Sequence, residues 1–232
     1  MKLRINLNNF KTTLACCLFI VSGAVFGQDI SAQLSDFNEL KVFNGIEVVL
    51  IPSEENRIEI TGHSKEKVKY QHVENRLELR LSLENIWTDD NTLVKIFFRK
   101  LQVIDANERS VVQVDGEIVG TNLVFRAQEG ASVFAGIDAL KQSSKAVTGG
   151  QVNLHGKVRE QEITINTGGQ FYGKKLISEN TEVSISAGGN AEVSAETYCK
   201  ATAKLGGTIL VFGNPEQLDR KTSFGGSIKK MN

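Results

Sequence analysis

The fold is decided by residues 149–226, which read GGQVNLHGKVREQEITINTGGQFYGKKLISENTEVSISAGGNAEVSAETYCKATAKLGGTILVFGNPEQLDRKTSFGG. A pair of adjacent glycines returns through this stretch at intervals of 19, 20, 18 and 19 residues. A period near twenty residues indicates a structural repeat. The five pairs are Gly149-Gly150, Gly168-Gly169, Gly188-Gly189, Gly206-Gly207 and Gly225-Gly226.

Each glycine pair is flanked by two short runs in which apolar and polar residues alternate, as in Glu-Ile-Thr-Ile-Asn over residues 162–166. This alternation is typical of a half-buried strand. Glycine accepts positive φ and lets one backbone lie close over another, so the pairs predict corners between strands. Degenerate corners at Arg109-Ser110 and Gly130-Ala131 continue the register upstream. The corner therefore needs small residues more than it needs a fixed sequence.

One such unit cannot bury its apolar face alone, but stacked units can pair backbone to backbone at about 4.8 Å per coil. The repeat therefore predicts an all-β fold, a right-handed parallel β-helix or β-solenoid with coils of about 19 residues. A β-sandwich with glycine-rich turns is the alternative. The strict register of the repeat favours the solenoid.

The N-terminus has the pattern of an export signal. Residues 1–27 combine three basic residues with an apolar run over residues 12–26, and we expect cleavage before Gln28. An uncleaved anchor is one alternative, for which the run is short. A lipoprotein signal at Cys16 is the other, although the apolar residues continue beyond that cysteine.

The rest of the chain has the length of one domain. Residues 28–36 are polar, and we expect a flexible lead-in there. Residues 37–232 form a single predicted β-helix domain, with longer strands over 37–100 and short regular coils over 101–232. Three lysines, Lys221, Lys229 and Lys230, would blunt the open strand edges of the last coil.

Loss of the signal would leave 24 Lys and Arg against 27 Asp and Glu, a net charge of −3. A mildly acidic chain without a basic patch is not expected to bind nucleic acid. No transmembrane segment is predicted in the mature chain. The expected location is the periplasm, the outer-membrane surface or the extracellular space.

The sequence predicts no cofactor and no metal site. His63, His72 and His155 are scattered, and Cys199 is the only cysteine beyond the signal, so no ligand cluster is visible. Cys199 lies on an alternating apolar set. We interpret it as a small buried hydrophobic residue rather than as a reactive thiol.

Two groups of residues are candidates for ligand chemistry. Trp87 beside Asp89 and Asp90 could stack on a sugar while the acids accept hydroxyl hydrogen bonds, or it could pack over the open end of the core. A ladder of carboxylates on adjacent coils could reach the separation of about 5 to 9.5 Å used in glycoside hydrolysis. The interleaved lysines instead indicate a solvated face. The acids are Glu160, Glu162, Glu179, Glu182, Glu192 and Glu196.

The chain resembles the bacterial family described as putative auto-transporter adhesin, head GIN domain. The resemblance rests on FNGIEV at residues 43–48, IEITG at 58–62 and NRLEL at 75–79, together with the strand at 94–98 and the small-residue corners. It covers roughly residues 37–228. It implies a right-handed β-helix and an adhesion role, with no catalytic residues assigned. No stretch of the sequence is predicted to form a translocating barrel, which is a departure from a literal autotransporter.

Three functions follow as hypotheses. The first is a non-enzymatic, exported β-helix that binds glycans or surface proteins in adhesion. The second is an envelope scaffold that associates with itself through its open coil ends. The third is a polysaccharide-active enzyme.

Overall fold

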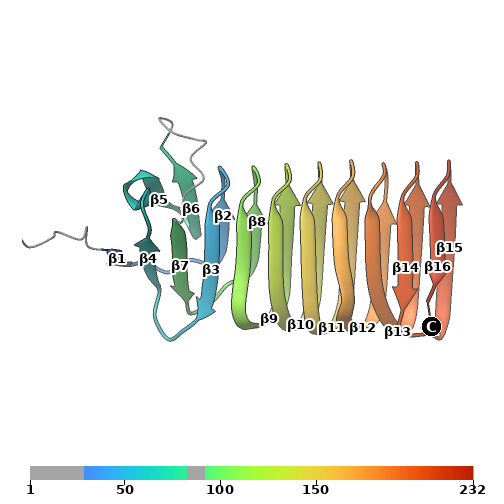
Figure 1. Ribbon diagram of the computed structural model, residues 1–232. Coiled ribbons are helices and arrows are strands. Elements are labelled where there is room, and N and C mark those ends of the chain that lie inside the picture. Colours follow the sequence, from blue (N-terminus) through green and yellow to red (C-terminus); the bar gives the residue numbers. More distant parts are fainter. Residues whose placement is uncertain (1–28, 83–91, 232) are drawn as a thin grey trace, which may run out of the picture.

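The computed structural model describes residues 29–82 and 92–231. Strands make up 71% of the chain and form a β-solenoid of about seven turns with coils of about 19 residues, which confirms the fold class. Figure 1 shows the coils stacked side by side along one axis. Within the described residues there is one 3₁₀ turn, Lys65–Lys67, and none of their helices is long and apolar enough to cross a membrane.

The strands fall into two groups. The N-terminal group is β1 Ile30–Gln33, β2 Glu39–Val42, β3 Glu47–Pro52, β4 Arg57–Thr61, β5 Val68–Val73, β6 Arg76–Leu81 and β7 Leu93–Phe98. The solenoid group is β8 Val103–Ala106, β9 Val111–Gln128, β10 Ser132–Val147, β11 Gln151–Asn166, β12 Gln170–Ile185, β13 Asn190–Lys204, β14 Thr208–Phe212, β15 Gln217–Ser223 and β16 Ser227–Lys230.

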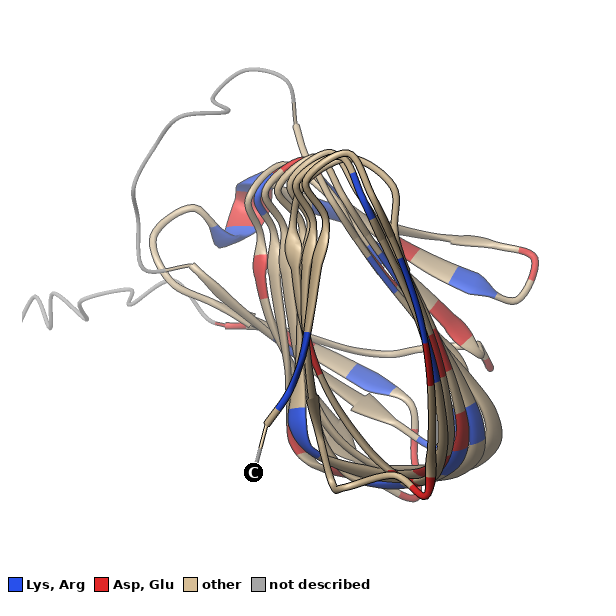
Figure 2. Cartoon of the chain, turned by 90° about the vertical axis from the view of Figure 1, so that its right-hand side faces the viewer, with Lys and Arg blue, Asp and Glu red and all other residues tan. Residues whose placement is uncertain are grey.

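From β9 onward every neighbouring pair of strands is parallel. Register shifts interrupt the pairing of β9 with β10, of β11 with β12 and of β12 with β13. Each of β9 to β13 continues from one side of the coil to the other, whereas the last coils are divided into β14, β15 and β16. Viewed along the stack, the coils superpose as a narrow loop with two long sides (Figure 2). One side ends in β14 and β16, and the other ends in β15.

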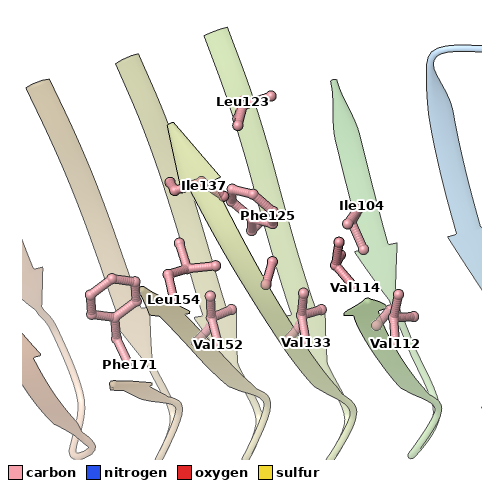
Figure 3. Close-up of a cluster of buried hydrophobic side chains, with 14 of the residues drawn as sticks. Ile104, Val112, Val114, Leu123, Phe125, Val133, Ile137, Val152, Leu154 and Phe171 are labelled. Carbon is pink, nitrogen blue, oxygen red and sulfur yellow. The ribbon is translucent and has the colours of Figure 1, made fainter. Parts of the chain in front are cut away.

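The core is a set of apolar rows that run along the inside of the stack. One row contains residues with at most 1% of their surface exposed, and parallel pairing places them in register. Figure 3 shows Val133, Val152 and Phe171 of this row, one from each successive coil. Burial of such side chains, at about 25 cal/mol per Å² of apolar surface, is what requires the units to stack. The row is Val133, Val152, Phe171, Ala191 and Ile209.

The glycine pairs lie at tight turns. At the first of them, Thr148 and Gly149 have φ of 50° and 73°, and the Gly150 amide donates to the Val147 carbonyl at 2.9 Å. Positive φ at both central residues is the geometry of a type I′ turn. The second glycine has another role, because a Cβ there would collide with the carbonyl of Ala127 in the preceding coil.

Hydrogen bonds along the stack continue through the turns. The Gly149 amide donates to the Thr167 carbonyl at 3.2 Å, and the Gly130 amide donates to the Thr148 carbonyl at 3.1 Å. The corner at Gly188-Gly189 departs from the others, because both of its glycines have positive φ, 59° and 106°. The interval of 20 residues in the repeat leads to this corner.

The N-terminal strands are not a simple continuation of the parallel coils. β2 and β3 pair in parallel with solenoid strands, but β4 is antiparallel to β7, and β5 and β6 form an antiparallel hairpin. Ile30–Gln33, expected to belong to a flexible lead-in, instead form β1 antiparallel to β4. The reason is that Ile30, Ala32 and Leu34 pack against the core. The predicted export signal, residues 1–27, lies outside the described residues.

Candidate binding groove

A groove of about 340 Å³ lies along the side of the stack formed by the second halves of β10 to β13. Its walls come from equivalent positions of four successive coils, because Lys141 pairs with Glu160, Glu160 with Asn180, and Asn180 with Tyr198. We call these four residues the groove row. Glu162 and Glu182, two residues further along their strands, also line the groove and are partners in register.

The charged ends of the groove are paired. Lys141 Nζ lies 2.8 Å from Glu160 Oε2, and Lys200 Nζ lies 2.7 Å from Glu182 Oε1. The hydrogen bond from Lys141 lowers the pKa of the Glu160 carboxyl, and the hydrogen bond to Glu182 raises the pKa of the Lys200 ammonium. All four side chains are between 44% and 62% exposed, so these pairs contribute little to stability. They hold the side chains in place along the groove.

Two groups in the middle of the groove have no partner within the described part of the chain. Neither the Glu162 carboxylate nor the Asn180 amide makes a side-chain hydrogen bond or an ion pair there. Tyr198, which is half-buried, donates its hydroxyl to Asp219 Oδ2 at 2.9 Å. That bond raises the pKa of the Tyr198 phenol and fixes the ring at the end of the groove row.

A buried polar ladder forms part of the groove's lining, because it includes Gln142, Gln161 and Thr181. Gln161 Nε2 donates to Ser178 Oγ at 2.9 Å and to Thr181 Oγ1 at 2.8 Å, and Ser178 Oγ donates to the Ser194 carbonyl at 2.8 Å. Gln142 extends the ladder by one coil through a longer contact of 3.5 Å to Gln161. Buried polar groups that are fully paired specify one arrangement of the strands. These hydrogen bonds between coils therefore fix the relative positions of the strands that carry the groove residues.

The groove presents acceptors, donors and an aromatic ring in one row. A carboxylate and a carboxamide that have no partner among the described residues can bind hydroxyl or amide groups, and a tyrosine ring offers an apolar face beside them. Among the residues that the structure describes, no group of three or more metal-ligating side chains occurs. The arrangement is suited to holding a polar, extended ligand.

The structure places only some of the candidate residues chosen from the sequence in the groove. Trp87, Asp89 and Asp90 fall within residues 83–91, outside the described residues. Of the six acids, the groove brings together Glu160, Glu162 and Glu182, while Glu179 forms an ion pair with Arg159 at 3.4 Å outside the groove. Glu192 and Glu196 do not line the groove either.

Asn180 and Tyr198 were not identified from the sequence, although their position relative to the glycine pairs could have indicated both. Each lies eight residues before the first glycine of a pair, as Lys141 and Glu160 do. Cys199, next to Tyr198, faces inward and is 0% exposed. Burial raises the pKa of its thiol to about 12, which agrees with the interpretation of an inert residue.

Comparisons with known proteins cover most of the chain. The family model described as "Putative auto-transporter adhesin, head GIN domain" matches residues 36–215. No curated protein matches the sequence.

Solved structures resemble the chain over 88% of its length and 96% of theirs. A putative adhesin from Bacteroides fragilis NCTC 9343 has a TM-score of 0.80 at 16% identity. Putative adhesins from Parabacteroides distasonis ATCC 8503 and Parabacteroides merdae ATCC 43184 have TM-scores of 0.71 and 0.66 at 18% and 19% identity. At such identities the likeness shows a shared fold.

Proposed function

The chain belongs to the family of putative auto-transporter adhesins, head GIN domain, and from this premise we propose that it is an exported adhesion module that binds a glycan chain in the groove row. One observation carries the proposal. The Glu162 carboxylate and the Asn180 amide have no partner among the described residues, and they lie in a groove that ends at the ring of Tyr198.

The chemistry of the groove suits hydroxyl-rich ligands. Carboxylate and amide groups accept and donate hydrogen bonds to hydroxyls, and the tyrosine face packs against the apolar side of a sugar ring. Successive coils lie about 4.8 Å apart, so the groove offers its groups at a regular interval. A polymer of repeating units is the kind of ligand that matches such an interval.

The pKa shift of a groove carboxyl favours binding without cleavage. A glycosidase needs one carboxylic acid with a raised pKa to protonate the leaving group. The ammonium of Lys141 instead lowers the pKa of Glu160. The Glu182 carboxylate forms an ion pair with Lys200 at 2.7 Å.

The test is retention on a panel of bacterial, plant and host polysaccharides, with release of new chain ends measured in the same samples. The protein used is the chain from residue 28 to residue 232. We expect retention on at least one polymer without new chain ends. Tyr198→Ala and Glu162→Gln should each weaken retention by about tenfold, as expected for the loss of one aromatic contact or one charged hydrogen bond.

Tyr172→Ala is the matched control for Tyr198→Ala. Tyr172 is also half-buried, but it belongs to the first half of β12, on the other long side of the coil. The control should retain the polymer as the unmodified chain does. Equal losses in the two variants, or retention that survives Tyr198→Ala, would contradict binding in the groove, and new chain ends would show cleavage instead.

A further inference from the structure

The tips of the corners form a ridge along the stack, and its character changes at the C-terminal end. The first residue of each two-residue turn has φ between 47° and 54° from Glu129 onward, apart from the glycine corner at 188–189. Glu129, Thr148 and Thr167 occupy this position in the earlier coils, whereas Leu205 and Phe224 occupy it in the last two. The ridge thus passes from polar to apolar.

Leu205 and Phe224 are exposed and conformationally unfavourable. Leu205 is 56% exposed and Phe224 is 82% exposed, at φ of 47° and 49°. The same φ recurs at Thr148 and Thr167, so it belongs to the turn, and what differs at the last two tips is the apolar side chain. The two tips are adjacent, because the Gly206 amide donates to the Phe224 carbonyl at 3.2 Å. Neighbouring exposed apolar side chains of this size mark an interaction site.

The same end of the stack is basic. Strands β15 and β16 of the last coil carry Arg220, Lys221, Lys229 and Lys230 against the single acid Asp219. Residues 28–216 have the opposite balance, with 26 Asp and Glu against 20 Lys and Arg. The C-terminal end is therefore a cationic surface on an acidic protein. Figure 2 looks onto this end of the stack.

Two of these cations occupy inward positions of their strands, where the preceding coils have buried apolar residues. Register pairs Arg220 with Ala201 and Lys230 with Val211, both of which are 0% exposed. Inward-facing charges on an edge strand discourage another strand from pairing with it. A second copy docked C-terminal end to C-terminal end would also bring like charges together. The end is better suited to an anionic partner.

We propose that the C-terminal end of the solenoid docks on an anionic lipid surface. Leu205 and Phe224 enter the interface between headgroups and acyl chains, and the four basic residues bind the headgroups. Reversible membrane binding generally combines an apolar contribution with a basic patch, and each cation near the surface strengthens it. Here both contributions lie on the last two coils.

The experiment is co-sedimentation of residues 28–232 with vesicles of phosphatidylcholine alone and of phosphatidylcholine mixed with phosphatidylglycerol. We expect the protein to bind the anionic vesicles only. The fraction bound should fall as salt rises from 0.05 to 0.5 M, because the shorter Debye length screens the basic residues from the headgroups. The double variant Leu205→Thr/Phe224→Thr installs the residue of earlier corners. It should bind at least about tenfold more weakly, since two exposed apolar groups no longer enter the lipid.

Charge is tested separately with Lys221→Gln/Lys229→Gln. These two side chains occupy the outward positions opposite Thr202 and Leu210, so Arg220 and Lys230 still guard the edge. Each lost cation should weaken binding by about fivefold. Val119→Thr and Lys145→Gln are matched controls, because Val119 is 75% exposed and Lys145 is exposed on coils remote from the end. Both should bind as the unmodified chain does.

The proposal is overturned by equal binding to both kinds of vesicle, by no binding to either, or by losses that are the same in the controls and the end variants. Sedimentation velocity without lipid identifies the competing occupant. If the chain forms dimers that Leu205→Thr/Phe224→Thr abolishes, the apolar tips bind a second copy and not a membrane.

Discussion

The two glycines of a corner should respond differently to the same substitution, although they are neighbours in the chain. At Gly168 a methyl group would meet no heavy atom within 4 Å, but φ is +74°. At Gly169 a methyl carbon would lie 2.2 Å from the carbonyl oxygen of Ala146, where ordinary contact begins at 3.4 Å. The first position is limited by conformation and the second by space.

The expected magnitudes follow from these two causes. Gly168→Ala places a Cβ in the left-handed region, which costs about 1–2 kcal/mol and is partly offset by about 0.4–1 kcal/mol from the stiffer unfolded chain. We expect a net loss of about 1 kcal/mol. Gly169→Ala requires the backbones of two coils to separate by about 1 Å, and overpacking of that kind costs about 3 kcal/mol or more.

The assay is equilibrium urea unfolding of both variants, followed by circular dichroism. Gly225→Ala and Gly226→Ala repeat the comparison in the last coil, where Gly225 has φ of +80° and a Cβ at Gly226 would collide with the carbonyl of Ala203. The reasoning is refuted if the two substitutions within a corner destabilise equally, or if the first glycine proves the more sensitive.

Three further predictions concern the edge, the thiol and a buried histidine. Arg220→Val/Lys230→Val should convert the C-terminal edge into a docking surface, so analytical ultracentrifugation should show concentration-dependent assembly; a strict monomer would contradict the guarding role of these charges. The Cys199 thiol, with a pKa of about 12, stays protonated at pH 8, so iodoacetamide should modify it only after unfolding, and labelling of the native chain would count against its burial. Both ring nitrogens of His72 are buried without a hydrogen-bond partner among residues 29–82 and 92–231, and the ring packs edge-on to Phe37, with the ring centroids 6.3 Å apart. His72→Phe should therefore raise the free energy of unfolding by about 1 kcal/mol, measured by thermal unfolding, and a loss of stability would indicate a polar partner in solution.

Spacing alone was enough to predict the regular coils. A glycine pair about every 19 residues, with alternating runs on both sides, sets the coil length, the corners and the inward residues next to them. The spacing does not place the register shifts that lie inside three of the strand pairings. The need for a small residue at the second glycine position also follows from the repeat, and the structure gives the reason: a Cβ at Gly150 would collide with the carbonyl of Ala127. Ser110 and Ala131 hold the same place in degenerate corners and are 0% exposed.

The N-terminal strands show where such reasoning stops. Alternation identifies a strand such as Arg57–Thr61, but it says nothing of the partner or its direction. β4 pairs with β1 and β7, both antiparallel, through contacts between segments far apart in the sequence. Without a repeat there is no second copy of the pattern from which to infer the register.

The sequence predicts that the residues of the groove row align, but it does not show that this row, among all outward rows, lines a groove. Lys141, Glu160, Asn180 and Tyr198 share one offset from the glycine pairs, so the repeat predicts that they form a row. Every outward offset predicts a row in the same way, and most such rows are solvated faces. What distinguishes this one is the pairing of Lys141 with Glu160 and of Lys200 with Glu182, which leaves Glu162 without a partner in the part of the chain that the structure describes. Those contacts depend on side-chain geometry, which spacing does not encode.

A solenoid separates the residues that hold it together from those available for binding. Inward rows and corners are constrained by packing and by φ, so their variation reports on stability. Outward rows and the two ends carry no such constraint. Bulky apolar residues at strained, exposed positions, as at Leu205 and Phe224, therefore have no explanation in the stacking itself. Thr148 and Thr167 serve the same turn with smaller, polar side chains, which is why the tips of the last two coils point to an interaction rather than to the fold.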